Sequence, residues 1–173
     1  RYNNDLFLRW SNRFNCKIRM NKTNRAIPFL FPFNFEDGMA QIGRRSGMGY
    51  VNKSGELVIP CYYSTGYPFS EGLAYVIKDD RKAFINKSGE VVISLNYEEA
   101  DMFSEGLAAV MNIGGKWGFI DQTGREVISC KYDEVNWFSE GLCGVYTKEG
   151  AGFIAKKGNE VIPFIYDNVL EFN

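Results

Sequence analysis

The chain has 173 residues, of which 45% are hydrophobic and 24% charged, so it can bury a core and should be globular. It contains no His, which excludes His-based catalytic triads, His-ligated zinc or haem and histidine pH switches. The net charge of −1 argues against a nucleic-acid binder, and no stretch approaches the roughly 18 apolar residues of a membrane span.

The first 34 residues are basic, with seven Lys or Arg against a single acid, Asp5. Residues 18–28 resemble the later segment 84–94, with Asn24 at the position of a turn Gly, and Asn tolerates the left-handed conformation. We therefore expect residues 1–34 to form a degenerate N-terminal repeat that caps the core. Their charges form either a solvated terminal segment or a basic patch that meets an acidic partner; the basic residues are Arg1, Arg9, Arg13, Lys17, Arg19, Lys22 and Arg25.

A five-residue motif then recurs at a fixed period. Phe-Ser-Glu-Gly-Leu occupies residues 69–73, 103–107 and 138–142, and the variant Phe-Glu-Asp-Gly-Met occupies 35–39. A period of 20–50 residues is the signature of a solenoid, a propeller or a similar array. The leading Phe recurs at 35, 69, 103, 138 and 172, which divides the chain after its cap into repeats 35–68, 69–102, 103–137 and 138–173.

Each repeat contains three apolar segments separated by turn residues. The first follows the pattern Leu-Ala-x-Val, the second ends in an aromatic–aliphatic pair, and the third is Val-Ile-x-x-x-Tyr. In the third segment, residues such as Ile128, Cys130 and Tyr132 share one face, which predicts β-strands. The intervening Asn-Lys-Ser-Gly or Asp-Gln-Thr-Gly predicts a hairpin turn with a left-handed Gly.

The predicted fold class is all-β, with tandem three-stranded antiparallel meanders of about 34 residues forming an open superhelix or solenoid. The alternative is a closed β-propeller, whose four-stranded blades usually take about 40 residues or more. One meander cannot bury its own apolar face, so neighbouring repeats should share a core. We expect that core to contain two columns: the Phe column (35, 69, 103, 138 and 172) and the Tyr column (63, 97, 132 and 166).

The segment Gly-Lys-Trp-Gly-Phe-Ile-Asp-Gln-Thr-Gly-Arg-Glu-Val-Ile, at 115–128, closely resembles the WG-containing repeat of bacterial proteins. The resemblance covers roughly residues 35–172, although the Trp-Gly pair occurs only at Trp117-Gly118. It implies a β-rich tandem array without an established catalytic activity, and it supplies no binding residues. The equivalent pairs are Met48-Gly49, Lys82-Ala83 and Ala151-Gly152.

No pattern points to catalysis, a cofactor or a metal. The chain lacks Gly-x-Ser-x-Gly and Ser-x-x-Lys, and Gly114-Gly115-Lys116-Trp117 lacks the first Gly and the Ser or Thr of a phosphate loop. The four Cys residues have no Cys-x-x-Cys spacing, so a zinc site is not expected. Scattered free cysteines favour a reducing cytoplasm, but the chain starts without Met, which leaves a removed signal peptide open.

The predicted function is a non-catalytic repeat scaffold that presents an extended surface to a protein or peptide partner. The alternative is a carbohydrate-binding module that meets a cell-wall or surface glycan through exposed Tyr and Trp. Aromatic residues outside the two columns are contact candidates, together with acids that recur once per repeat. A row of such acids could bind a cation or a basic peptide, or the acids could simply be turn residues with solvated side chains. The contact candidates are the aromatic residues Tyr75, Trp117, Trp137 and Tyr146 and the acids Glu71, Glu105 and Glu140.

Overall fold

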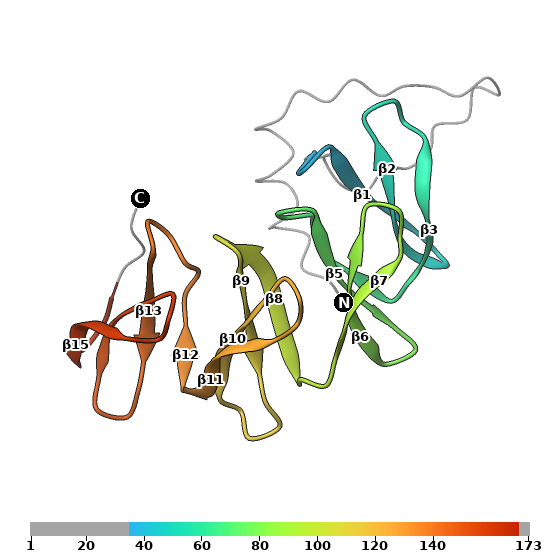
Figure 1. Ribbon diagram of the computed structural model, residues 1–173. Coiled ribbons are helices and arrows are strands. Elements are labelled where there is room, and N and C mark those ends of the chain that lie inside the picture. The colour runs from blue at the N-terminus through green and yellow to red at the C-terminus, as the bar shows by residue number, and fades with distance from the viewer. Residues whose placement is uncertain (1–34, 170–173) are drawn as a thin grey trace, which may run out of the picture.

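The computed structural model describes residues 35–169, which form four antiparallel β-sheets without a helix (Figure 1). The first sheet is a meander in chain order, with the strands β1 (Met39–Arg44), β2 (Gly47–Asn52) and β3 (Leu57–Tyr63). The all-β prediction is confirmed, and none of the described sheets closes into a barrel. The expected N-terminal repeat, 1–34, and Phe172 lie outside the described residues.

The other three sheets have four strands each, again in chain order. The second sheet comprises β4 (Thr65–Gly66), β5 (Leu73–Lys78), β6 (Arg81–Asn86) and β7 (Val91–Leu95). The third comprises β8 (Glu99–Ser104), β9 (Leu107–Met111), β10 (Trp117–Asp121) and β11 (Glu126–Tyr132). The fourth comprises β12 (Glu134–Val135), β13 (Leu142–Tyr146), β14 (Ala151–Ala155) and β15 (Glu160–Tyr166).

Three of the sheets have an additional strand at their N-terminal edge (β4, β8 or β12), which corrects the prediction of three-stranded units. This strand starts four residues ahead of the Phe column, at Thr65, Glu99 and Glu134, outside the three apolar segments of each repeat. This segment pairs with the strand that follows the Glu-Gly turn, so the turn joins two strands of the same sheet. The stretches Thr65–Gly66 and Glu134–Val135 are only two residues long, which is too short to show an alternating pattern.

The sheets pack face to face, and the core lies between them. Adjacent residues of a strand point to opposite faces of a sheet, so Phe84 packs with Phe103 of the third sheet while Ile85 packs with Tyr50 of the first. Both Phe84 and Ile85 have an exposed fraction of 0%. The aromatic–aliphatic pair of each repeat is therefore explained by burial on both faces. Burial of such a side chain contributes about 1.5–3 kcal/mol.

The Phe column packs on the aromatic ring of the preceding sheet. Ring centroids lie 4.9 Å apart for Tyr50 and Phe69, 4.7 Å for Phe84 and Phe103, and 4.9 Å for Phe119 and Phe138. The predicted core role is confirmed for Phe69, Phe103 and Phe138, which are 1–2% exposed. Phe35 is 42% exposed, since no sheet of the described part precedes it.

The Tyr column is only partly in the core. Tyr63 and Tyr132 are buried and Tyr97 is half-buried, whereas Tyr166 is 49% exposed and the prediction is wrong there. Tyr166 ends the last described sheet, so no later sheet in this part of the chain covers its ring.

The glycine of the Trp-Gly position lies at a β-bulge, where the neighbouring strand passes close to its backbone. A Cβ on Gly118 would lie 2.5 Å from Ile128 O and 2.7 Å from Cys130 N. The register shifts beside this glycine, because Trp117 pairs with Tyr132 whereas Phe119 pairs with Ile128. The second sheet has Ala83 at this position, and its strands pair there without that shift. The glycine is therefore needed because the third strand crosses so close to it.

Candidate functional site

The recurring acids lie in two-residue hairpin turns, with both turn residues in the left-handed region. The φ angles are 53° at Glu71 and 51° at Glu105, and the glycines that follow have φ angles of 85° and 86°. Asp37 and Glu140 adopt the same conformation, with φ angles of 53° and 52°. A left-handed conformation costs a residue with a Cβ about 1–2 kcal/mol, so some interaction should offset this cost.

Each of the first three acids bonds to the turn of the next sheet. The amide of Gly72 donates to Asp37 Oδ2 at 2.5 Å. The amide of Gly106 donates to Glu71 Oε2, and that of Gly141 to Glu105 Oε2, both at 2.9 Å. Consecutive sheets are therefore linked by the same hydrogen bond at each of the three described junctions.

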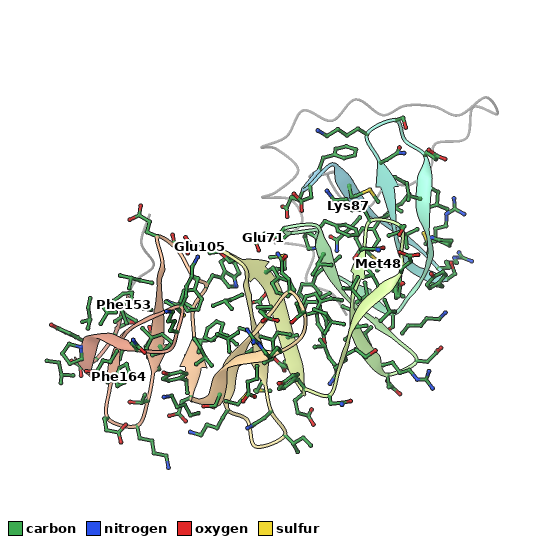
Figure 2. The ribbon with its side chains drawn as sticks, in the orientation of Figure 1. Met48, Glu71, Lys87, Glu105, Phe153 and Phe164 are labelled. Atoms are coloured by element: carbon green, nitrogen blue, oxygen red, sulfur yellow. The ribbon has the colours of Figure 1, made fainter. Side chains whose placement is uncertain are left out.

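The serine of the motif adds a second bond. The hydroxyl of Ser70 donates to the backbone oxygen of Phe103, and that of Ser104 donates to Phe138, both at 2.7 Å. We call these hydroxyl and carboxylate bonds the inter-sheet ladder. Glu71 and Glu105, labelled in Figure 2 and predicted as contact candidates, thus already have hydrogen-bond partners within the molecule.

Side chains from a second set of turns also meet the ladder. Gln122 Nε2 donates to Glu71 Oε2 at 3.1 Å, and Lys156 Nζ lies 3.0 Å from Glu105 Oε2. The hydrogen bond from Lys156, with smaller help from the amide of Gly141, lowers the pKa of Glu105 below its ordinary value. Glu140 stands at the last described turn, and within residues 35–169 its carboxylate has no bonding partner.

The four aromatic contact candidates differ in how deeply their side chains are buried. Tyr75 is 3% exposed, and its ring lies 5.7 Å from Phe84 between the second and third sheets. Its prediction as a contact residue is therefore wrong, because β5 is covered on both faces. Trp117 is half-buried against the core between the third and fourth sheets, so most of its packing is internal.

Tyr146 and Trp137 lie nearer to the surface. The hydroxyl of half-buried Tyr146 lies 2.5 Å from Asn168 Oδ1 and 3.0 Å from the backbone oxygen of Val169. Trp137 is 48% exposed, and its Nε1–H donates to Asp101 Oδ2 at 2.8 Å. Of the four aromatic candidates, Trp137 thus offers the most exposed ring.

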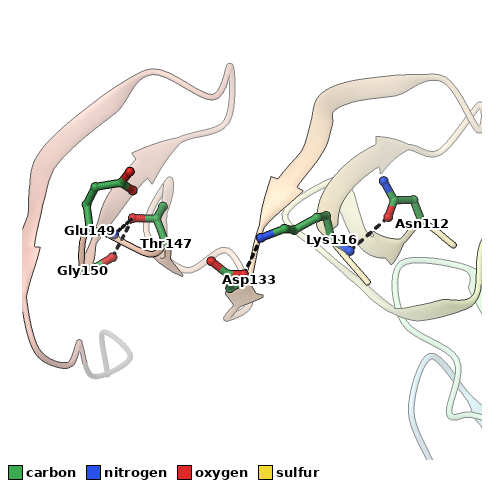
Figure 3. Close-up of polar contacts among 6 residues, drawn as sticks. All are labelled: Asn112, Lys116, Asp133, Thr147, Glu149 and Gly150. Carbon is green, nitrogen blue, oxygen red and sulfur yellow. Dashed lines mark hydrogen bonds and ion pairs between the residues drawn. The ribbon is translucent and has the colours of Figure 1, made fainter. Parts of the chain in front are cut away.

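An open groove of about 330 Å³ lies at the junction of the third and fourth sheets. Lys116 pairs there with Asp133 (Figure 3), and the Thr147 hydroxyl lowers the pKa of Glu149 through a hydrogen bond. No sequence pattern indicates this groove, because its residues come from four separate segments of the chain. It is lined by Lys116, Lys131, Tyr132, Asp133, Thr147, Lys148, Glu149 and Phe164.

The described part of the chain, residues 35–169, contains no group of three or more Cys, Asp or Glu side chains placed to hold a metal ion. It also contains no helix that is long and apolar enough to cross a membrane.

Short antiparallel meanders, stacked at a fixed period and joined by the same bonds, define a tandem-repeat protein of the all-β class. The chain belongs to the family described as WG containing repeat, which matches residues 48–81, 83–117, 117–149 and 152–173. The resemblance found in the sequence is thereby confirmed.

No curated protein matches the sequence. Among solved structures, the chain is similar to the computationally designed Ika8 protein, at 12% identity and a TM-score of 0.44. The match covers 71% of this chain and 44% of that one, so the chain spans less than half of the length of the designed protein.

Proposed function

We propose that the protein is a non-catalytic scaffold whose stacked sheets present an extended surface to a protein partner. The observation that carries this proposal is which residues are used inside the stack of sheets and which are exposed on its surface. Many side chains that recur in the repeats pack between sheets or form the ladder, as Phe103 and Glu71 do. Some residues that differ between repeats, such as Trp137 and Ile113, are exposed and can give one surface its specificity.

Photo-crosslinking of the whole chain tests the proposal. A crosslinking amino acid is placed singly at Val92, Trp137 or Ile165, which are 48%, 48% and 72% exposed. We expect at least one position to capture a protein that also binds the purified chain in calorimetry. A control at buried Phe84 should capture nothing. The proposal fails if no captured protein binds the purified chain.

The groove is the observation that favours carbohydrate binding as a second candidate. Tyr132 and Phe164 contribute aromatic edges to it, and Lys131, Thr147 and Glu149 contribute polar groups. Glycan-array binding that is lost in Thr147→Val and Phe164→Ala, without protein capture, would favour this candidate. The absence of glycan binding would leave the groove without this role.

We also propose that the array is an open superhelix and not a closed ring. The first and fourth sheets lie at opposite ends of a curved row in Figure 1, which supports this form. Spin labels at Lys53 and Lys157, on turns of these two sheets, test it by electron paramagnetic resonance. An open array gives a separation well above that of labels on neighbouring sheets, whereas a ring brings the two ends close together.

A further inference from the structure

The side chains of Trp137 and Asp101 form a corner between the third and fourth sheets. Asp101 belongs to β8, and Trp137 lies between β12 and β13. The indole N–H donates to Asp101 Oδ2 at 2.8 Å, and the ring remains 48% exposed. Equivalent positions hold Pro68 and Met102, so the stack does not require an indole here.

The carboxylate of this corner is held from two directions. The amide of Met102 donates to Asp101 Oδ1 at 2.7 Å, while the indole of Trp137 donates to Oδ2. Each oxygen can still accept a further hydrogen bond. The corner thus combines a fixed anion with an exposed aromatic surface beside it.

The surrounding sequence has more acids than bases. The two segments that meet at the corner, 96–110 and 132–147, contain seven Asp or Glu, while Lys131 and Lys148 flank the second segment and Lys82 bonds to the backbone oxygen of Tyr97. Lys116 pairs with Asp133, and Lys156 pairs with Glu105, which reduces the negative charge only in part. A cation therefore gains from the local field as well as from the corner.

We propose that the Trp137–Asp101 corner binds the guanidinium group of an arginine on a partner protein. A guanidinium can stack on the indole face and donate two parallel hydrogen bonds to the carboxylate, which an ammonium cannot do. This inference rests on the proposed scaffold function and narrows its partner to one with an exposed basic segment.

The test uses the blocked peptide Gly-Arg-Gly-Arg-Gly and the same peptide with citrulline, which has the shape of arginine without its charge. Binding to the whole chain is followed through the indole N–H signal of Trp137 in nitrogen-15 NMR, assigned by its loss in Trp137→Phe. We expect a saturable shift with the arginine peptide and at least about tenfold weaker binding of the citrulline peptide.

Two variants separate the corner from general attraction. Asp101→Asn keeps an oxygen that can accept the indole hydrogen bond but removes the charge, and we expect about tenfold weaker arginine binding. Glu56→Gln removes one charge in the first sheet and should change the affinity less than about twofold. Equal binding of both peptides, or equal effects of the two variants, overturns the proposal. If crosslinked partners still bind after such a result, only the corner is wrong and the scaffold function stands.

Discussion

A glutamate in the left-handed region is an uncommon choice for a two-residue hairpin turn, where Asn, Asp and Gly are preferred. The ladder explains the choice at Glu71 and Glu105. From this backbone position a glutamate side chain meets the glycine amide of the next turn at 2.9 Å. The conformational cost at each turn is thus offset by a charge-assisted bond between sheets.

The ladder predicts different costs for the same substitution at two equivalent turns. Glu105→Ala removes a ladder bond, whereas Glu140→Ala removes a carboxylate with no partner among residues 35–169; both variants keep a Cβ in the left-handed region. We expect Glu105→Ala to lower the free energy of unfolding by about 1 kcal/mol more than Glu140→Ala. Urea denaturation measures the difference, and equal losses would show that the ladder bond adds nothing.

The lowered pKa of Glu105 predicts a pH dependence. The folded protein binds a proton at this carboxylate more weakly than the unfolded chain, whose value is the ordinary 4.5. The contribution to stability is therefore complete above 4.5 and is lost as the pH falls through the lowered folded value. Glu105→Gln should lose less stability than the parent protein between pH 7 and pH 3 in urea denaturation. Glu140→Gln removes the same charge without a ladder bond and serves as the control; a parallel loss in all three would contradict the prediction.

At the scale of the strand, the pairing of β10 with β11 depends on a residue without a side chain. The sheets with Gly49, Gly118 and Gly152 have a bulge at this place, and the sheet with Ala83 does not. The final strand differs accordingly, with seven residues in β3, β11 and β15 but five in β7. One methyl group thus decides the local path of a strand.

Gly118→Ala should therefore destabilise the third sheet. Its Cβ would meet backbone atoms that cannot turn away as a side chain can, so we expect a loss of about 1–3 kcal/mol. Ala83→Gly has no such clash to relieve, and we expect a loss of about 0.5–1 kcal/mol from the added chain freedom. Thermal denaturation compares the two variants. A loss in Gly118→Ala no larger than that in Ala83→Gly would argue against the close crossing.

The sequence predicted the repeating strands and turns well, because periodic residues such as Phe103 and Gly124 have local reasons for their positions. It missed the additional strand, since β4 and β12 have only two residues each and show no alternating pattern. It also misplaced Tyr75, because a strand covered on both faces lacks the alternation that marks an exposed side chain. The ladder could have been suspected from Glu at a turn position, but its partners are about 35 residues away.

For the whole molecule, stability should vary along the stack. The third sheet has a described neighbour on both faces, whereas the fourth has one on a single face. In hydrogen exchange we therefore expect the amides of β14 to exchange at least about tenfold faster than those of the matching strand β10. Equal protection of the two strands would instead mean that the stack opens as a single cooperative unit.

The Phe column has a spacing of 35 residues in the third repeat and 34 in the others, and β9 and β10 are joined there by a wider turn than β5 and β6. The ladder bonds on either side are both 2.9 Å long, although they span 35 and 36 residues. Contacts between sheets, and not chain length, thus keep the repeats in phase. Ile113, at the tip of that turn, is 84% exposed. A foreign epitope or tag could be inserted beside it and displayed outside the stack without altering the spacing of the sheets.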